Sequence, residues 1–281
     1  MRILETPETR LALDDEGEPS APPVLLLHAG NATRSMWDPV LPGLAEQHRV
    51  VRFDARGFGD SGPVTGPYLG SGDVVAVLDA LAIERAVLIG SSFGGRLAMD
   101  TALAAPDRVA ALVTIDAVPS GAVPIYTATE QRLAEAADRA ETAGDWALRA
   151  ELDVDIWSVG PTRGRDEVDP VFLAGAVRAA HEHVRLLRTA PSAACRAAGE
   201  PAADRLGELR MPLLSIVGEH DLAFTRAQHG RTIAAAGGPA RGALIPGTAH
   251  FPSIERPAAV LQVLLPWLGD LPARHGRHRP R

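Results

Sequence analysis

The feature that most constrains this chain is a Gly-x-Ser-x-Gly pentapeptide at residues 90–94, placed between an apolar run at 86–89 and a helix-forming stretch at 96–105. A strand that feeds a helix through so tight a turn strains the central residue and requires small neighbours. The turn lifts the hydroxyl of Ser92 above the strand, where the first helical amides face a developing negative charge. Ser92 is therefore the candidate nucleophile, and a chance pentapeptide in a Gly- and Ala-rich chain is the alternative.

A serine hydroxyl needs a base to accept its proton and a carboxylate to orient that base. Residues 212–217 are apolar and predict a buried strand, and Asp221 lies in the loop that leaves it. His250 follows a second apolar stretch, 243–245, and a glycine turn. Both side chains are expected at the same sheet edge as Ser92, in the chain order Ser, Asp, His.

Each of these partners has an alternative. Asp221 could cap a helix around residues 225–236, because acidic side chains favour that position. His250 could be a packed core histidine. Asp116 is a rival orienting acid, since it leaves the predicted strand 109–115 at the same edge.

Two upstream segments complete the pattern. The short apolar strand 24–27 runs into the loop His28-Ala29-Gly30-Asn31, and a backbone amide of this loop would face the amide of Phe93. Such a pair can hold an oxyanion, and one donor typically lowers the barrier by about 3 kcal/mol. Residues 50–62 predict a strand that opens into a glycine-rich turn, for which a structural role is expected.

In these landmarks the chain resembles the α/β-hydrolase superfamily, in its capped esterase, lactonase and haloperoxidase-like branch. The landmarks are the His-Ala-Gly loop with Trp37, Asp54-x-Arg56-Gly57-x-Gly59-x-Ser61, the Ser92 elbow, Pro106-Asp107-Arg108-Val109, and the loops of Asp221 and His250. The resemblance covers about residues 23–116 and 211–268. It implies a Ser92, His250, Asp221 triad with the amides of Gly30 and Phe93 as the oxyanion hole. Because Ala29 stands where the family usually has glycine, Asn31 is the alternative amide donor.

The resemblance also bears on the reaction. Haloalkane dehalogenases and the related epoxide hydrolases use an aspartate at the elbow, so Ser92 argues against those chemistries. Cleavage of a small-molecule ester or lactone through an acyl-enzyme on Ser92 is the expected function. Carbon-carbon bond hydrolases, perhydrolases and lyases use the same triad and stay open as alternatives. A receptor that binds a small molecule without turnover is a further alternative.

Residues 119–205 differ in character from both flanks. Amphipathic helices are predicted at 129–142, 146–156 and 171–188, separated by Gly and Pro. We expect an α/β fold with a mostly parallel twisted sheet flanked by helices, in which 119–205 form a helical cap inserted after strand six. The core would then comprise residues 1–118 and 206–272.

Several side chains of the predicted cap are candidates for lining the substrate pocket. Trp157 and Phe172 are the aromatic ones, although packing between cap helices is the alternative for each, and Asn31 would join them from the first loop. His181 and His183 point to different helix faces and are expected to be solvated. Residues 273–281 are expected to form a flexible tail.

Composition limits the partners. At 281 residues with 46% hydrophobic residues the chain can bury a large core. A net charge of −7 argues against nucleic acid binding, and no apolar run approaches the roughly 20 residues of a membrane span. Without a secretory signal or a disulfide pair, a cytoplasmic protein with a small-molecule substrate and no cofactor or metal is expected. The sequence leaves open whether it forms a homodimer.

Overall fold

The structure is a computed structural model that describes residues 1–189, 195–196 and 199–272. The predicted tail, residues 273–281, lies outside the described residues, as do residues 190–194 and 197–198 of the predicted cap.

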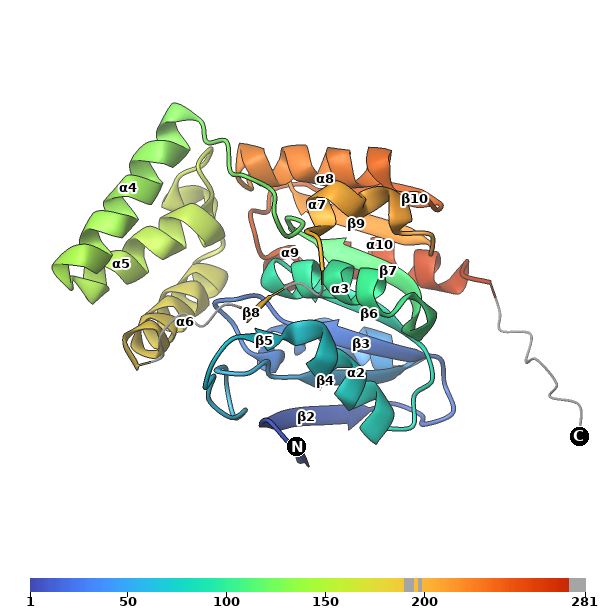
Figure 1. The fold of residues 1–281 in the computed structure, drawn as a ribbon. Helices are drawn as coiled ribbons and strands as arrows, with labels where there is room; N and C mark the ends of the chain where they lie inside the picture. The colour runs from blue at the N-terminus through green and yellow to red at the C-terminus, as the bar shows by residue number, and fades with distance from the viewer. Residues whose placement is uncertain (190–194, 197–198, 273–281) are drawn as a thin grey trace, which may run out of the picture.

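An eight-stranded sheet forms the centre of the described chain, in the order β1-β2-β4-β3-β6-β7-β9-β10 (Figure 1). The first two strands form an antiparallel hairpin, and β2 also runs antiparallel to β4, whereas β4, β3, β6, β7, β9 and β10 run parallel to one another. The strands are β1 (Arg2–Glu5), β2 (Arg10–Glu16), β3 (Pro23–Leu27), β4 (Arg49–Phe53), β6 (Ala86–Ser91), β7 (Val109–Ile115), β9 (Leu213–Gly218) and β10 (Ala240–Ile245).

Helices cover both faces of this sheet, so its central strands β3, β6, β7 and β9 are mostly apolar and almost entirely buried. Along β3, Leu25 and Leu27 join one buried cluster, and Val24 and Leu26 join another, as the alternation of side chains in a strand requires. The first cluster packs on α2 (Gly70–Ala80) and α3 (Phe93–Ala104), the second on α1 (Leu41–Ala45) and α10 (Pro257–Gly269). The mostly parallel, two-face-covered sheet predicted from the sequence is confirmed.

Shorter elements complete the described chain. Helix α8 (Ala223–Ala235) packs against β9 and β10. The remaining pieces are α7 (Ala202–Arg205), α9 (Pro252–Glu255) and a two-stranded sheet of β5 (Tyr68–Leu69) and β8 (Cys195–Arg196). Among the described residues, no helix combines the length and the apolar character needed to cross a membrane.

Three helices follow β7, the sixth strand of the main sheet along the chain, and lie together to one side of it (Figure 1). They are α4 (Ala128–Ala143), α5 (Trp146–Asp153) and α6 (Pro170–Thr189). We call the whole segment that contains them, residues 128–189, the helical insertion. Helix α4 begins at a capping box made by Thr127 and Glu130 and ends at Gly144, whose φ is 72°. The predicted helix 146–156 is α-helical only to Asp153 and continues as a π-helical segment, Val154–Val159.

Candidate active site

Ser92 occupies the turn between β6 and α3 with φ 51° and ψ −113°, a conformation that L-residues rarely adopt. The turn needs its glycines. A Cβ on Gly90 would lie 2.2 Å from the carbonyl oxygen of Gly94, and a Cβ on Gly94 would lie 2.1 Å from that of Leu27. The backbone N–H of Ser92 donates to the carbonyl of Ile115 at 2.8 Å. The strained strand-to-helix turn expected from the sequence is therefore present.

The structure brings Ser92, His250 and Asp221 together. The Nε2 atom of His250 lies 2.8 Å from Oγ of Ser92, and its Nδ1 lies 2.9 Å from Oδ2 of Asp221. Because an ionised carboxylate can only accept, Nδ1 carries the imidazole proton and Nε2 is free to accept from the serine hydroxyl. Asp221 is fully buried and His250 is 4% exposed. The arrangement can move a proton away from Ser92 and stabilise the imidazolium that results.

The helical insertion helps to hold the imidazole. The backbone N–H of His250 donates to the carbonyl of Trp157 at 3.0 Å, and the rings of the two residues lie 4.7 Å apart. On the other side, the ring of Phe251 meets the imidazole edge-on at 5.3 Å. His250 is thus a histidine presented by a loop toward the serine, with the π-helical segment against it.

A buried ion pair ties the insertion to the same loop. The guanidinium of Arg163 donates to both carboxylate oxygens of Glu255, at 2.7 and 2.9 Å, and to the carbonyl of Gly247 at 2.7 Å. The two charged side chains are only 3% and 4% exposed. Glu255 also accepts the N–H of Ala249, the residue before His250. Removing one charge would leave the other buried and unpaired.

Asp221 reaches the imidazole through one oxygen, and its other oxygen accepts the backbone N–H of Leu222 at 2.7 Å. Helix α8 begins after Leu222, which occupies the N-cap position without a side-chain cap. The alternative in which Asp221 caps a helix is therefore wrong.

The rival acid, Asp116, lies beside the other two groups. Ligand atoms of Asp116, Asp221 and His250 all lie within 4.8 Å of one another. One oxygen of Asp116 accepts the N–H of Gly218 at 2.8 Å, and the other is buried without a hydrogen-bond partner among the described residues. Burial, with repulsion from Asp221, raises the pKa of Asp116 well above its ordinary range. Two carboxylates this close do not both ionise, so Asp116 keeps its proton.

Among the described residues, this trio is also the one group of His, Cys, Asp and Glu side chains whose atoms lie close enough to hold a metal ion. Both imidazole nitrogens of His250 already face protein partners, Ser92 and Asp221. The hydrogen-bond chain accounts for the cluster without an ion.

The two predicted oxyanion residues are neighbours. A Cβ on Gly30 would lie 3.4 Å from the Cβ of Phe93, and both residues line a cavity with Ser92. Phe93 begins α3, so its N–H has no acceptor within the helix. The Gly30 loop is fixed by His28, whose Nε2 accepts the N–H of Ala55 at 2.9 Å. Burial lowers the pKa of His28, which keeps the ring neutral for this role.

The glycine-rich turn after β4 has a structural role. Its anchor is the fully buried Asp54, which accepts backbone N–H groups of Arg34 at 2.7 Å and Asp60 at 3.0 Å and pairs with the Arg34 guanidinium. A Cβ on Gly59 would lie 2.1 Å from that carboxylate. The turn therefore holds the first loop in place, which is the structural role expected for it.

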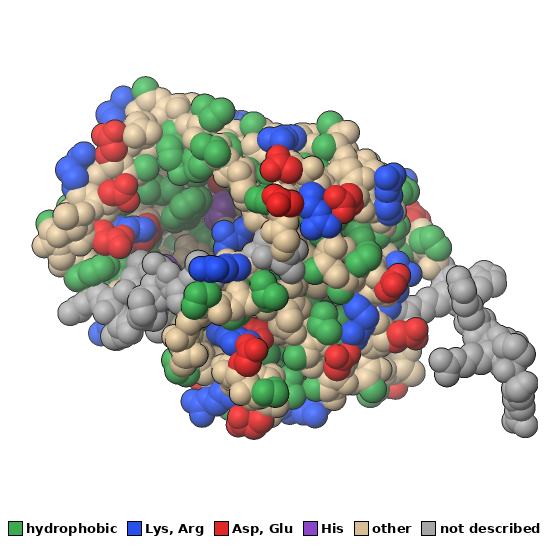
Figure 2. All heavy atoms as spheres, in the orientation of Figure 1, with side chains coloured by type: hydrophobic (Ala, Val, Ile, Leu, Met, Phe, Trp, Pro, Cys, Tyr) green, Lys and Arg blue, Asp and Glu red, His purple; other side chains and the backbone are tan. Residues whose placement is uncertain are grey.

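Two cavities meet at Ser92 and His250. One, of about 290 Å³, is bordered mostly by apolar groups that include Val118 and Phe224, with Arg96 among the charged ones. The other, of about 230 Å³, is bordered by more polar groups, together with Phe93 and Trp157. Trp157 lines both. Figure 2 shows a hollow beside the helical insertion, with hydrophobic side chains around it and a histidine visible inside.

The candidate substrate residues divide between these cavities. Asn31 and Trp157 line the cavities at Ser92. Phe172 instead lines a neighbouring cavity of about 570 Å³ that Asn31 shares but Ser92 does not. Phe172 thus lies one cavity away from Ser92, whereas it was expected to line the substrate pocket.

The prediction that His183 is solvated holds only in part, because its side chain is half-buried and its Nδ1 atom is enclosed. Burial, with the charge of Arg149, lowers the pKa of His183 to about 4. It lines the polar cavity at Ser92 together with Arg149 and Asp153. Neither Arg149 nor Asp153 was identified as a site residue from the sequence. Their spacing of four residues is the available signal, but the same spacing is typical of solvent-exposed ion pairs on helices.

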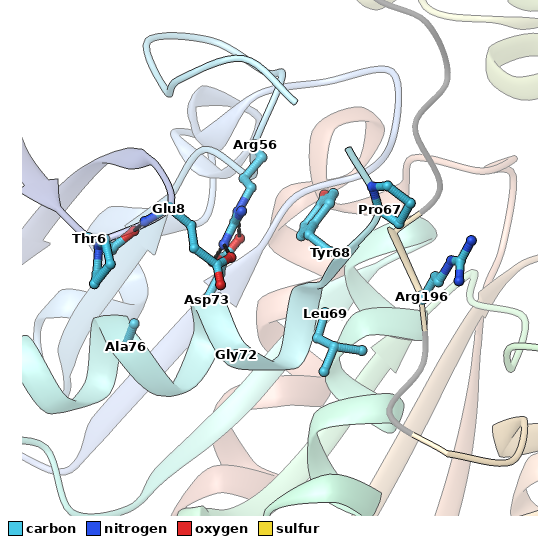
Figure 3. Close-up of a pocket in the computed structure, with 11 residues that line it drawn as sticks. Thr6, Glu8, Arg56, Pro67, Tyr68, Leu69, Gly72, Asp73, Ala76 and Arg196 are labelled. Carbon is cyan, nitrogen blue, oxygen red and sulfur yellow. Dashed lines mark hydrogen bonds and ion pairs between the residues drawn. The ribbon is translucent and has the colours of Figure 1, made fainter. Parts of the chain in front are cut away.

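A separate cavity of about 520 Å³ lies away from Ser92, beside α2 and β5 (Figure 3). Its buried Arg56 donates to both oxygens of Asp73 at 2.7 Å and to Glu8 at 2.8 Å, and it lies over the ring of Tyr68. These charges satisfy one another, so this cluster stabilises the fold around the glycine-rich turn.

The chain is similar to several known hydrolases in sequence and in structure. Epoxide hydrolase A of Mycobacterium tuberculosis is 28% identical over 317 aligned positions, which cover 97% of this chain and 98% of that protein. A pimeloyl-[acyl-carrier protein] methyl ester esterase of Aliivibrio salmonicida is 28% identical over 76% of this chain and 78% of its own. The enol-lactonase structure from Burkholderia xenovorans superposes with a TM-score of 0.73 and 26% identity, over 96% of this chain and 100% of that one.

A family model also matches most of the chain. Residues 22–257 match the family described as the alpha/beta hydrolase fold, a span that includes Ser92, Asp221 and His250. Because this match extends over most of the chain and the sheet order and elbow agree with it, the protein belongs to the α/β-hydrolase family.

Proposed function

We propose that this protein is a serine hydrolase that cleaves a small-molecule carboxylic ester or lactone. The observation that carries the proposal is the chain of contacts from Oγ of Ser92 to His250 at 2.8 Å and from His250 to Asp221 at 2.9 Å. A strained serine in contact with an imidazole that a carboxylate orients is the arrangement that nucleophilic acyl transfer requires.

In the proposed first half-reaction, Nε2 of His250 takes the hydroxyl proton while Oγ of Ser92 attacks the substrate carbonyl carbon. The amides of Phe93 and Gly30 stabilise the oxyanion of the tetrahedral intermediate. His250 then returns the proton to the leaving alkoxide, which departs as an alcohol and leaves an acyl-Ser92. In the second half-reaction, His250 activates water, and the acid is released with Ser92 regenerated. Asp221 orients the imidazole throughout and stabilises its charged form.

The relatives support the substrate class. Those named above include an enzyme that acts on a methyl ester and one named an enol-lactonase. The similarity to Epoxide hydrolase A supports the fold, but the resemblance described above associates epoxide hydrolysis with an aspartate at the position of Ser92. The cavities of about 290 and 230 Å³ at the serine accommodate a small substrate. We propose that residues 119–205 act as a cap over this site.

Replacement of Ser92 tests the proposal. The wild-type protein is expected to release p-nitrophenol from p-nitrophenyl acetate with an initial burst equal to the enzyme concentration, and to gain one acetyl group at Ser92 by mass spectrometry. Ser92→Ala should abolish the burst, the acetyl group and turnover of γ-butyrolactone. Ser91→Ala is the control, because the neighbouring Ser91 hydroxyl is buried without a partner among the described residues.

Three outcomes would contradict the proposal. Wild-type turnover in Ser92→Ala would reject the nucleophile, and a wild-type protein that shows neither acylation nor turnover of any ester or lactone would favour a receptor. Slow ester cleavage alongside rapid cleavage of a carbon-carbon bond, a cyanohydrin or a peroxide-dependent substrate would favour the alternative chemistries on the same triad.

A further inference from the structure

The polar cavity at Ser92 contains groups that the triad and the oxyanion hole do not use. Arg149 and Asp153 come from α5, His183 comes from α6, and all three border the cavity of about 230 Å³ that also contains Ser92 and His250. In a ligand pocket, a small number of polar groups fix the orientation of the substrate.

Asp153 has an oxygen available to a ligand. Its side chain is 6% exposed, and one oxygen accepts from Nε of Arg149 at 3.0 Å. Among the described residues, the hydrogen bond from Arg149 to Oδ1 is the one hydrogen bond that this carboxylate makes, which leaves Oδ2 available to a group in the cavity. Burial raises the pKa of Asp153 even beside Arg149, as expected for a carboxylate that lacks sufficient donors. Asp153 also borders the larger cavity of about 570 Å³, so it stands where the two cavities adjoin.

His183 also has a polar atom that lacks a hydrogen-bond partner. Its Nδ1 atom is buried with no hydrogen-bond partner among the described residues. The lowered pKa of about 4 keeps the ring neutral, so one nitrogen accepts and the other donates. A buried polar atom without a partner is unfavourable, and it is expected to be satisfied when its natural ligand is bound.

The balance of charge decides what kind of ligand fits. The positive charge of Arg149 is already paired with Asp153 and with Glu141, and His183 is neutral. The cluster therefore has one positive and two negative charges, and a substrate carboxylate or phosphate would add a third negative charge to it. A neutral group with a hydrogen to donate, such as a hydroxyl or an amide N–H, would instead pair with the vacant oxygen of Asp153.

We propose that Asp153 and His183 form a specificity subsite for a neutral hydrogen-bond donor on the substrate, so that the enzyme prefers hydroxy- or acylamino-substituted esters and lactones to unsubstituted or carboxylated ones. The subsite rests on the proposed function, because it orients a carbonyl toward Ser92. In this arrangement the polar substituent lies between α5 and α6, and the hydrocarbon part occupies the apolar cavity next to Val118 and Phe224.

The experiment compares lactones that share one ring. The probes are γ-butyrolactone, α-hydroxy-γ-butyrolactone, N-acetyl-homoserine lactone and a carboxylated γ-butyrolactone. For the wild-type enzyme, kcat/KM is expected to be about tenfold or more higher for the hydroxy and acetylamino compounds than for the unsubstituted ring, as one hydrogen bond to a charged group allows. The carboxylated compound should be the poorest of the four.

Two variants assign this preference to the subsite. Asp153→Asn should reduce the preference for the substituted lactones at least about fivefold, mainly through KM, because the carboxamide is a weaker acceptor. His183→Leu should reduce it as well. Glu141→Gln is the matched control, since Glu141 pairs with the same arginine but does not border the cavity; its preference should equal that of the wild type.

The outcomes separate the two proposals. If the wild-type enzyme cleaves none of the probes and forms no acyl-Ser92 with p-nitrophenyl acetate, the proposed function fails. If it cleaves all four lactones with the same kcat/KM, or prefers the carboxylated one, the subsite is wrong while the serine hydrolase stands. A preference that survives in both Asp153→Asn and His183→Leu would also overturn the subsite.

Discussion

Replacement of Asp116 by Asn should change how the stability of this protein depends on pH. In the folded protein Asp116 is fully enclosed next to Asp221, and burial, followed by repulsion from Asp221, raises its pKa well above the ordinary value of 3.8. In the unfolded chain it has the ordinary value. Between these two values the unfolded state releases a proton that the folded state retains, so the free energy of unfolding falls as pH rises.

The size of this effect follows from the number of protons. One proton retained only by the folded state lowers the free energy of unfolding by about 1.4 kcal/mol per pH unit. Asn has no proton to release, and its carboxamide oxygen can still accept the N–H of Gly218. The variant should therefore gain stability relative to the wild type by up to about 1.4 kcal/mol for each pH unit above the ordinary pKa of Asp116, as long as the folded wild type keeps the proton.

Urea unfolding followed by tryptophan fluorescence measures this difference, since the chain has 4 Trp residues. Wild type and Asp116→Asn are compared at pH 5, 6 and 7, with Asp107→Asn as the control because Asp107 is exposed. The difference from the wild type should grow with pH for Asp116→Asn and stay constant for Asp107→Asn. Parallel curves for wild type and Asp116→Asn would show that Asp116 is ionised in the folded protein and would refute the reasoning.

Two further substitutions test the elbow and the link to the helical insertion. Gly94→Ala should lower kcat by about 100-fold or more, because its Cβ would lie 2.1 Å from the backbone oxygen of Leu27 and must displace the first turn of α3. Gly72→Ala is the control, since there is open space around the new Cβ, and it should keep the wild-type kcat. Normal activity of Gly94→Ala would contradict the geometry of the turn. Arg163→Met should destabilise the protein by about 3–5 kcal/mol by leaving Glu255 buried without its partner. Thermal unfolding measures this, and an unchanged melting temperature would disprove the importance of the pair.

The sequence alone determined the elements of this site that depend on local chemistry and on strand order. Gly90 and Gly94 around Ser92 specify a turn that few other structures need. Ser92, Asp221 and His250 each follow an apolar strand, and the ends of parallel strands meet at one edge of a sheet, so their convergence could be predicted without coordinates. Hydrophobic periodicity likewise predicted the helices after residue 119.

Only the tertiary structure decided which of several chemically similar residues take part in the site. Asp116 and Asp221 both end neighbouring parallel strands, and it is the approach of the His250 loop that gives the imidazole to Asp221 and leaves Asp116 protonated. Arg149, Asp153 and His183 have the spacing and composition of an exposed helical surface. They border the cavity at Ser92 because the tertiary structure brings α5 and α6 to it, and burial depends on contacts between distant segments that no local pattern contains.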